Sequence, residues 1–338
     1  MTPTTQARVI ILIPVFNDWD CVFLMLPLLD EAVSRTGADI RVLLVDDGST
    51  RKLPANLNHP PGGHLRQIDV LHLSRNLGHQ RAIAIGLFYI HQNLPCEQVI
   101  VMDADGQDRP DDVPALLEAA ARYPGQVIFA ARTKRLETIS FRIGYHLYRW
   151  AHRALTGISV RVGNFSVLPW EALGRLMAVS DLWSHYAAAV FRARLEYQTI
   201  PLPRGPRLVG NSRMNFYALL VHGLSAICVF GDIVSARALA AALSFFALAA
   251  GVGLAVFGLH SGAGWAIPTW ALYLCAAVAL LSVQAVIAAI VLSFIIIGGR
   301  SQMSFLPLRD GRYFIRGLTQ LARAESSSRP PAPAVTRV

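Results

Sequence analysis

The chain has 338 residues, of which 53% are hydrophobic and only 16% are charged, and its formal net charge is +9. The length allows one large domain or two ordinary ones, and the apolar content is unusual for a soluble protein. The four cysteines show no paired spacing, which argues against a zinc site and against a disulfide framework.

Strands and helices are predicted to alternate through the first part of the chain. Residues 8–15 form an almost continuous apolar run, which is typical of a parallel strand buried on both faces. A helix is expected to follow to about residue 36, and another helix at 79–92. Further strands are predicted at 40–45, 68–73, 99–102 and 127–131. This alternation with short links indicates a doubly wound α/β sheet.

Polar residues follow each of these predicted strands. They are Asn17 and Asp18, Asp46 and Asp47, Arg75 and Asn76, Asp103 and Asp105, and Arg132. In doubly wound sheets, ligands bind beyond the carboxyl ends of the strands. The sequence therefore predicts an active site at that edge of the sheet.

The segment Asp103-Ala-Asp-Gly-Gln-Asp108 is the strongest candidate for a metal site. Two carboxylates, Asp103 and Asp105, with the amide oxygen of Gln107 form an oxygen-rich site suited to Mg²⁺ or Mn²⁺, and such ions often hold nucleotide phosphates. The alternative is an Asp-rich turn that caps the helix beginning at Pro110. No Gly-x-Gly-x-x-Gly follows the first strand and no Gly-Lys-Ser/Thr loop exists, so the metal and basic side chains are expected to hold the phosphates.

Two amphipathic segments are predicted outside the sheet. Residues 142–155 form a basic amphipathic helix, which is typical of a membrane-surface element and equally compatible with a helix packed on the core. Residues 216–236 carry one apolar stripe and are too interrupted to span a bilayer, so this helix is expected to lie in the interface.

Two uncharged segments, 238–259 and 270–297, are long enough to cross a membrane. Arginines flank the pair on both sides, whereas the connecting loop 260–269 has neither Lys nor Arg, so both polar regions are expected in the cytoplasm. The net positive charge then fits anionic lipid headgroups better than nucleic acid. Residues 9–15 are too short for the apolar core of a signal peptide.

The predicted organisation has four parts. They are a catalytic domain at 1–215, the interfacial helix at 216–236, a transmembrane hairpin at 237–297, and a cytoplasmic tail at 298–338. The low-complexity end of the tail, from residue 326, is predicted to be disordered.

Six short motifs, taken in order, resemble those of a known enzyme family. They are Ile13-Pro-Val-Phe-Asn-Asp18, Val45-Asp-Asp-Gly-Ser-Thr50, Leu73-Ser-Arg-Asn-Leu-Gly78, Asp103-Ala-Asp-Gly-Gln-Asp108, Gly163-Asn-Phe165 and Arg207-Leu-Val-Gly-Asn-Ser-Arg-Met214. The region from about 8 to 235 is similar to the inverting family-2 glycosyltransferases of GT-A fold. The branch it resembles transfers sugar from a nucleotide-sugar to a polyprenyl phosphate, such as dolichyl or undecaprenyl phosphate. That branch also carries a membrane hairpin.

The resemblance implies roles for particular residues. The donor, a UDP- or GDP-linked sugar, would be bound by Pro14, Val15, Asp18, Asp46, Asp47, Asn76, Gly78, Asp103, Ala104, Asp105 and Arg132. Asp103, Asp105 and Gln107 would hold Mg²⁺ or Mn²⁺. Arg207, Ser212 and Arg213 would receive the acceptor phosphate, and Asp105, Asn164, Arg207 and Arg213 would form the catalytic set. The resemblance also implies an integral protein of the bacterial inner membrane, with the catalytic domain in the cytoplasm, and makes self-association an expectation.

The sequence departs from the family pattern at three positions. Asn164 stands where the family often has an acidic residue that looks like the base, with Asp181 and His185 as candidate stand-ins. An alcohol acceptor needs a base, whereas a phosphate monoester is already an anion, so Asn164 favours a phosphate acceptor. Gly106 and Arg109 replace the usual apolar residue and proline of the metal loop.

Three alternatives remain open at this point. The first is transfer to another lipid, which would need a base. The second is a catalytically inactive membrane scaffold. The third, a processive polysaccharide synthase, is disfavoured because the family's Gln-x-x-Arg-Trp motif is matched only by His146-Leu-Tyr-Arg-Trp150, which comes too early and lacks the Gln.

Overall fold

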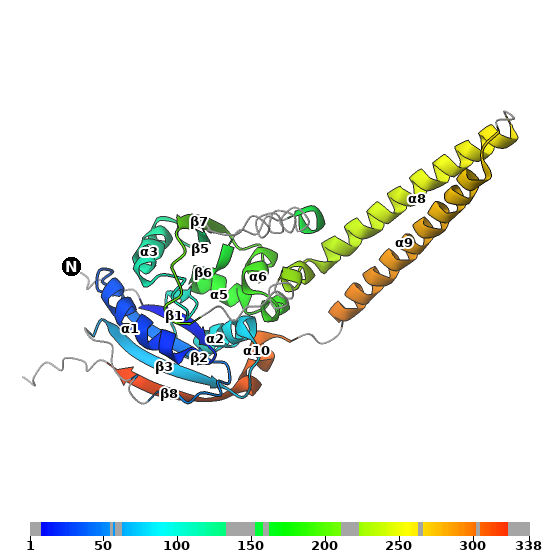
Figure 1. The fold of residues 1–338 in the computed structure, drawn as a ribbon. Helices are drawn as coiled ribbons and strands as arrows, with labels where there is room; N and C mark the ends of the chain where they lie inside the picture. The colour runs from blue at the N-terminus through cyan, green and yellow to red at the C-terminus, as the bar shows by residue number, and fades with distance from the viewer. Residues whose placement is uncertain are drawn as a thin grey trace, which may run out of the picture. The chain divides into compact units, whose positions relative to one another are not determined.

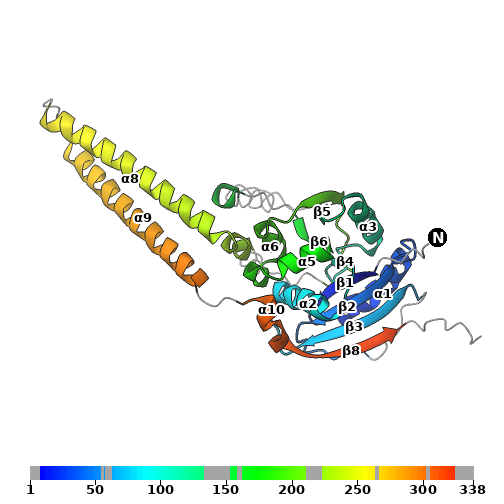
Figure 2. The ribbon, with the colours of Figure 1, turned by 180° about the vertical axis from the view of Figure 1, so that it is seen from behind.

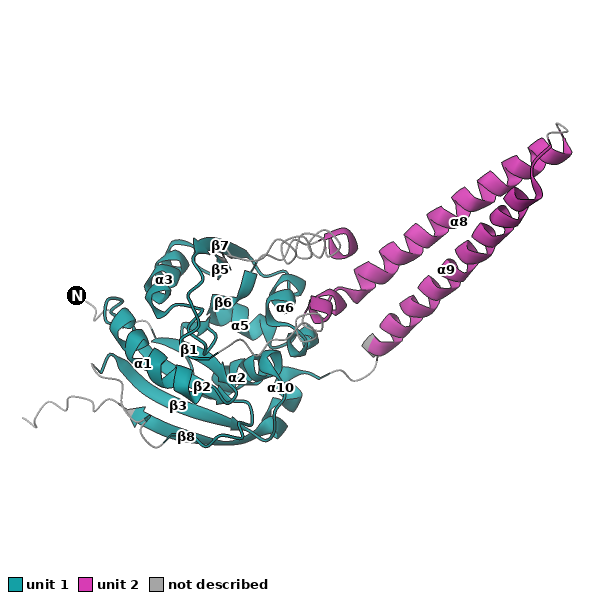
Figure 3. Ribbon diagram, viewed as in Figure 1, with its two compact units in different colours: residues 1–135, 161–215, 305–338 teal, residues 136–160, 216–304 magenta. Residues whose placement is uncertain are grey.

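The computed structural model describes residues 8–54, 57, 63–132, 153–157, 162–210, 223–262, 266–301 and 305–323. The chain divides into two compact units (Figure 3). Unit 1 comprises residues 1–135, 161–215 and 305–338, and unit 2 comprises residues 136–160 and 216–304.

Unit 1 contains one eight-stranded sheet in the order β7-β5-β6-β4-β1-β2-β3-β8. The strands are β1 (Arg8–Val15), β2 (Asp39–Asp46), β3 (Leu65–Leu73), β4 (Gln98–Val101), β5 (Val127–Arg132), β6 (Val162–Pro169), β7 (Tyr197–Leu202) and β8 (Ile315–Arg323). β6 and β8 pair antiparallel to their neighbours, and the other pairings are parallel. The predicted doubly wound, mostly parallel α/β sheet is confirmed, and all five predicted strands are present.

Helices cover both faces of this sheet because the buried strands alternate their side chains between two apolar clusters. On one face, Ile11 and Ile13 pack in the cluster that contains α1 (Trp19–Val33) and α3 (Val113–Arg122). On the other face, Ile10 and Leu12 pack in the cluster that contains α2 (His79–Asn93), α5 (Trp170–Leu176) and α6 (Tyr186–Arg192). Figures 1 and 2 show this arrangement from opposite sides.

The strand order reverses beside β1, which pairs with β2 on one side and with β4 on the other. The connections that follow β1 and β4 therefore diverge at the carboxyl edge of the sheet. Ligands of open α/β sheets bind at such a switch point. Asp18 follows β1, and the Asp103–Asp108 segment follows β4, so the fold places both beside this point.

The sequence analysis assigned 298–338 to a tail and did not predict β8, which joins the edge of the sheet (Figures 1 and 2). β8 follows two short helices, α10 (Pro307–Asp310) and η3 (Gly311–Phe314). The rings of Phe305 and Phe314 lie 3.7 and 5.1 Å from that of Trp183 in η2 (Ser180–Trp183). These contacts join the returning segment to unit 1.

Unit 2 contains two long apolar helices, α8 (Gly231–Ser261) and α9 (Thr269–Ser301), which lie side by side (Figures 1 and 2). Both are long and apolar enough to cross a membrane, and they are the two such helices in the described parts of the chain. The predicted spans, 238–259 and 270–297, lie within them. Their large apolar side chains are mostly exposed, as expected of a surface that faces lipid.

The two predicted amphipathic segments lie partly outside the described residues. Residues 142–152 and 216–222 are outside, while residues 223–228 are helical and α8 has already begun at residue 231. The boundaries at 215 and 236 therefore stay predictions.

Candidate functional site

The Asp103–Asp108 segment, here called the metal loop, is a turn folded by its own carboxylates. Asp108 Oδ2 accepts the Asp103 N–H at 2.9 Å, and Asp105 Oδ1 accepts the Gln107 N–H at 3.0 Å. The next helix, η1 (Pro110–Asp112), has no side-chain hydrogen bond from its N-cap residue, Arg109. The turn is therefore held by hydrogen bonds within the loop, and its metal-binding role stays a prediction.

Each of the three predicted metal ligands lies next to a basic side chain. Asp103 Oδ1 is 3.1 Å from His79 Nε2, and Asp105 Oδ2 accepts from Arg207 Nη1 at 3.2 Å. The third contact is a hydrogen bond from Arg204 Nη2 to Gln107 Oε1. The metal loop is therefore a place where the fold already binds positive charge.

The residues present fit a divalent cation through their chemistry. Two carboxylates and one amide oxygen are hard ligands of the kind that Mg²⁺ and Mn²⁺ prefer. Among the described residues, no group of three or more His, Cys, Asp or Glu side chains is arranged to hold a metal ion. The metal prediction therefore depends on the Gln107 amide as its third protein ligand.

Residues 203–210, here called the strap, run across the metal loop and bind it through the backbone. The N–H of Gly205 donates to the carbonyl of Gln107 at 2.9 Å, and the N–H of Leu208 donates to the carbonyl of Asp105 at 3.0 Å. Leu208 fills the space beside Gly106, which has a φ of +80°, and a Cβ on Gly106 would lie 2.7 Å from Leu208 Cδ1. Leu208 therefore supplies the apolar group that Gly106 lacks.

Arg207 connects the loops that follow β1 and β4. Its Nη2 lies 2.9 Å from both carboxylate oxygens of Asp18, its Nη1 reaches Asp105, and its Nε donates to the carbonyl of Val209 at 2.9 Å. Its side chain is only 15% exposed. Burial acts to lower the pKa of Arg207, but its pairing with Asp18 and the nearby Asp105 carboxylate together outweigh burial and raise the pKa.

The structure thus places Arg207 among predicted donor-binding residues, whereas the sequence analysis assigned it to the acceptor phosphate. The acceptor role stays a prediction. Ser212 and Arg213, the other two predicted acceptor residues, lie outside the described residues.

Asp47 fastens two loops at the carboxyl edge of the sheet. Its side chain is buried, and its two oxygens accept the N–H groups of Leu77 at 2.7 Å and Gly78 at 2.9 Å. Asn76 Nδ2 also donates to the Asp47 carbonyl at 3.2 Å. Burial raises the pKa of Asp47, and the two backbone N–H groups offset that rise only in part.

Asp46 is held at both of its carboxylate oxygens. Oδ1 accepts the Ser49 N–H at 2.9 Å, and Oδ2 lies 3.0 Å from His72 Nδ1. His72 Nε2 in turn lies 3.0 Å from the Thr319 hydroxyl on β8. The sequence analysis did not identify His72 or Thr319, and Thr319 gave no local signal because its partner is 247 residues earlier in the chain.

Asn164 lies on β6, is 8% exposed, and is oriented by a chain of hydrogen bonds. The Tyr186 N–H donates to Gln80 Oε1 at 2.7 Å, and Gln80 Nε2 donates to Asn164 Oδ1 at 3.1 Å. Because the backbone N–H fixes the Gln80 amide, Asn164 turns its Nδ2 toward His79 Nε2, 2.9 Å away. Asn164 therefore lies one side chain away from Asp103.

His79 and Gln80 are site residues that the sequence analysis missed, although they directly follow the Leu73–Gly78 motif. Burial acts to lower the pKa of His79, but the Asp103 carboxylate beside it, with further help from Asp108 and Asp47, outweighs burial and raises the pKa. His79 therefore lies between the Asp103 carboxylate and the Asn164 amide.

The two candidate stand-ins for a base, Asp181 and His185, each have a partner of their own. Asp181 lies 3.8 Å from Arg192. His185 is the N-cap of α6, and its Nδ1 accepts the Ala188 N–H at 3.3 Å. Their role as a base stays a prediction.

The remaining predicted residues lie at strand ends or in the loops just described. Pro14 and Val15 end β1 and pair with Val45 and Asp46 of β2. Gly78, whose φ is +93°, precedes α2, Ala104 is buried in the metal loop, and Arg132 is the last residue of β5.

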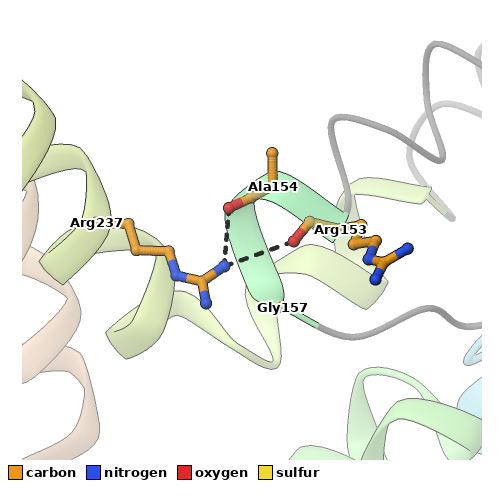
Figure 4. A pocket seen from close by; sticks show the side chains of 4 residues that line it. All are labelled: Arg153, Ala154, Gly157 and Arg237. Atoms are coloured by element: carbon orange, nitrogen blue, oxygen red, sulfur yellow. Dashed lines mark hydrogen bonds between the residues drawn. The ribbon is translucent and has the colours of Figure 1, made fainter.

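Unit 2 contains a separate open pocket of about 490 Å³, lined by Arg153, Ala154, Gly157 and Arg237. Arg237 Nη1 donates to the carbonyls of Ala154 at 2.8 Å and Arg153 at 3.5 Å, while the Arg153 side chain points away (Figure 4). Carbonyls at a helix end are satisfied in this way. The pocket therefore has a structural explanation and no converging catalytic groups among its lining residues.

Comparison with known proteins found a matching family and several similar relatives. Residues 10–169 match the family described as "Glycosyl transferase family 2". The chain is 35% identical over 124 residues to an undecaprenyl-phosphate 4-deoxy-4-formamido-L-arabinose transferase of Sodalis glossinidius (strain morsitans), with 36% of each chain covered. It is 24% identical over 225 residues to the "uncharacterized glycosyltransferase YkcC" of Bacillus subtilis (strain 168), with 65% of this chain and 67% of the relative covered. The match to the first relative thus spans about a third of its length.

Among solved structures, a glucosyl-3-phosphoglycerate synthase from Mycobacterium tuberculosis, in complex with Mn²⁺ and UDP-glucose, is similar at a TM-score of 0.47 and 13% identity. The similarity covers 68% of this chain and 79% of that one. A TM-score this low does not support a statement about the family or the function of the chain. The assignment follows instead from the matched family, which covers β1 to β6 and all the residues of the metal loop: the chain contains a glycosyltransferase family 2 domain at residues 10–169.

Proposed function

We propose that this protein is a membrane-anchored inverting glycosyltransferase that moves a sugar from a nucleotide-sugar to a polyprenyl phosphate. Three observations support the proposal together. The domain belongs to glycosyltransferase family 2, a relative carries the name of an undecaprenyl-phosphate sugar transferase, and two helices are long enough to cross a membrane. The choice of a phosphate as the acceptor rests on one observation, which is that an amide, Asn164, stands where a general base would be expected.

Asn164 cannot serve as a general base, since a neutral amide takes up no proton at physiological pH. Its Oδ1 is occupied by Gln80, and its Nδ2 is directed at His79. A hydroxyl acceptor would need a base to remove its proton. A phosphate monoester already carries an anionic oxygen that can attack directly. The buried amide at this position therefore favours a lipid phosphate over a sugar or lipid alcohol.

The metal loop and its neighbours are well suited to hold the donor diphosphate. Asp103, Asp105 and Gln107 would hold the Mg²⁺ or Mn²⁺ ion, which when bound neutralises charge on the departing nucleoside diphosphate. Arg204, Arg207 and His79 already lie against these three side chains. Arginine side chains fixed in this way stabilise negative charge that develops on a leaving group.

The acceptor would approach from the strap. In this proposal Arg207, Ser212 and Arg213 receive its phosphate, and Arg132 lies near the donor phosphates. The phosphate oxygen then forms a bond to the anomeric carbon on the face opposite the bond that breaks to the nucleoside diphosphate, which inverts that carbon. No proton needs to be removed in this step.

The location and the partners belong to the same proposal. Arginines flank α8 and α9 and are absent from the loop between them, which supports a cytoplasmic catalytic unit. The membrane would be a bacterial inner membrane, and the donor would be a UDP- or GDP-linked sugar.

A transfer assay in detergent tests the proposal. Purified protein would receive Mn²⁺ or Mg²⁺, undecaprenyl phosphate and, one at a time, labelled UDP- and GDP-sugars, and label would be counted in the organic extract. We expect metal-dependent label from one donor, and a loss of at least about 100-fold in the Asp105→Asn variant. Asp39→Asn is the matched control, since Asp39 lies at the amino end of β2, opposite the site.

The other outcomes separate the alternatives. Label that appears with a diacylglycerol or ceramide acceptor and not with undecaprenyl phosphate would contradict the acceptor class. Absence of both transfer and nucleotide binding would favour the inactive scaffold. Full activity in Asp105→Asn would remove the metal loop from the mechanism.

A further inference from the structure

Three neighbouring strands each contribute one side chain to a linear hydrogen-bonded group. Asp46 ends β2, His72 lies near the end of β3, and Thr319 lies within β8. His72 uses both ring nitrogens, with Nδ1 3.0 Å from Asp46 Oδ2 and Nε2 3.0 Å from Thr319 Oγ. Asp46 is 9% exposed, while Thr319 is on the solvent side of the edge strand.

The chemistry of the three groups assigns their donors and acceptors. An ionised carboxylate only accepts, so Nδ1 of His72 must carry the hydrogen that is donated to Asp46. In the neutral ring, Nε2 is then an acceptor, and the hydroxyl of Thr319 donates to it. Thr319 therefore stabilises the one neutral tautomer of His72 that can hold Asp46. Histidines that hold functional groups are commonly oriented through the other ring nitrogen in this way.

The other oxygen of Asp46 is held as well, because Oδ1 accepts the Ser49 N–H at 2.9 Å. The carboxylate plane is thus fixed from both ends. Each carboxylate oxygen keeps a further lone pair that can accept from an N–H group of a base or from a ribose hydroxyl. A fixed acceptor of this kind recognises a nucleoside without having to be ordered on binding.

We propose that His72 and Thr319 are positioning residues of the donor-nucleotide site, and that the C-terminal strand β8 supplies one of them. The proposal rests on the proposed function, in which Asp46 contacts the nucleoside part of the donor. It means that the strand following the two long helices completes the nucleotide site of the domain that precedes them. The ligand class is a nucleoside diphosphate.

Two substitutions of His72 distinguish positioning from mere packing. In His72→Asn the amide nitrogen lies where Nδ1 was and can still donate to Asp46, whereas in His72→Gln the amide group lies nearer the position of Nε2. We expect the Asn variant to bind within about threefold of wild type and the Gln variant to bind about tenfold more weakly. The measurement is the Kd of UDP and of GDP, with Mn²⁺, by calorimetry of the full chain in detergent.

Thr319 provides an independent test that leaves the ring in place. Thr319→Val keeps the shape and removes the hydroxyl, and we expect about a two- to fivefold loss of nucleotide affinity, which Thr319→Ser should restore. Thr199→Val on β7 is the matched control, since Thr199 is an exposed threonine on the opposite edge strand. In the transfer assay the loss should appear in KM for the donor, with kcat little changed.

The outcomes separate the two proposals. If wild type binds neither UDP nor GDP, the proposed function fails. If wild type binds one of them and both His72→Gln and Thr319→Val bind it equally well, the positioning role is overturned. If His72→Gln does not fold, the Thr319 series decides alone. Equal losses in Thr319→Val and Thr199→Val would also contradict the inference.

Discussion

Neighbouring aspartates in this protein have different tasks because their carboxylates face different partners. Asp46 faces a histidine side chain and one backbone N–H, while Asp47 is buried and accepts two backbone N–H groups from the loop after β3. The sequence alone shows only two adjacent acidic residues. It predicted that both lie at the carboxyl edge of the sheet, since β2 ends there, but it could not assign partners that come from another loop.

Asp47→Asn should lower the stability of the folded protein, because it removes one of the two acceptors that hold the loop after β3. The amide has one acceptor oxygen, so one backbone N–H of the pair would face an amide NH₂ group, and an unsatisfied buried donor costs about 1–3 kcal/mol. We expect the melting temperature in detergent to fall by about 3–10 °C. Asp111→Asn, on a side chain that is 61% exposed, is the control and should change it little. An unchanged melting temperature in Asp47→Asn would contradict this assignment.

The same substitution has a defined pH dependence. Burial raises the pKa of Asp47 above its ordinary value of 3.8, so the folded protein binds this proton at higher pH than the unfolded chain does. Protonation of Asp47 therefore stabilises the folded protein fully below pH 3.8, and this stabilisation is lost as the pH rises through the raised pKa. The difference in melting temperature between wild type and Asp47→Asn should widen as the pH falls through that window. If this difference in melting temperature stayed constant or narrowed as the pH fell, the raised pKa of Asp47 would be contradicted.

The sequence could predict the part of the site whose residues are close together in the chain, and it could not predict contacts between distant residues. The metal loop could be proposed from sequence because its three predicted ligands, Asp103, Asp105 and Gln107, are close together in the chain. His79 was missed because a histidine after a glycine-ended motif carries no sign of the two side chains it meets, Asp103 and Asn164. Arg207 was noticed, but its pairing with Asp18 spans 189 residues and depends on the fold.

At the scale of elements, the strap and the metal loop form one matched pair. Leu208 occupies the position that a side chain on Gly106 would need, and the two segments share backbone hydrogen bonds. Gly106→Ala should destabilise the fold through the overlap with Leu208 and through its φ of +80°. Leu208→Ala alone should cost the lost apolar contact, which is about 2 kcal/mol for a partly buried leucine.

The double variant Gly106→Ala, Leu208→Ala should cost less than the sum of the two single variants, because the overlap is gone. The coupling is expected at about 0.5–3 kcal/mol, typical of residues in contact, and melting temperatures of the four proteins measure it. Leu94→Ala is the control partner for Gly106→Ala, since Leu94 packs on the opposite face of the sheet and should give additive changes. Additivity in the Leu208 pair would show that the strap does not dock as described.

The strands divide into those that a sequence predicts and those that it does not. β1, β2 and β3 are buried on both faces and read as apolar runs closed by polar residues, so their positions were predicted within a few residues. β7 and β8 are edge strands with mixed polar and apolar residues. Because β8 pairs with β3, which lies some 250 residues earlier, no local pattern could reveal that the predicted tail returns to the sheet.

For the whole molecule, the pairing of β3 with β8 limits how the chain can cross a membrane. Residues before α8 and residues after α9 belong to the same sheet, so both must lie on the same side of the bilayer. A chain that leaves the sheet and returns to it can cross only an even number of times. The two candidate spans satisfy this condition. A single crossing would put β8 and β3 on opposite sides of the membrane, where they could not pair.

Cysteine labelling tests this topology. The substitutions are Ser261→Cys at the end of α8 and Gln320→Cys in β8, both at exposed positions. In intact spheroplasts, a membrane-impermeant maleimide should label Ser261→Cys above the background of the unsubstituted chain, which already has an exposed Cys228. Gln320→Cys should gain label only after permeabilisation, since the proposed orientation puts its strand, with the rest of the sheet, on the cytoplasmic side. Label at both positions in intact cells would contradict the two crossings, and the reverse pattern would keep the hairpin but invert the proposed orientation.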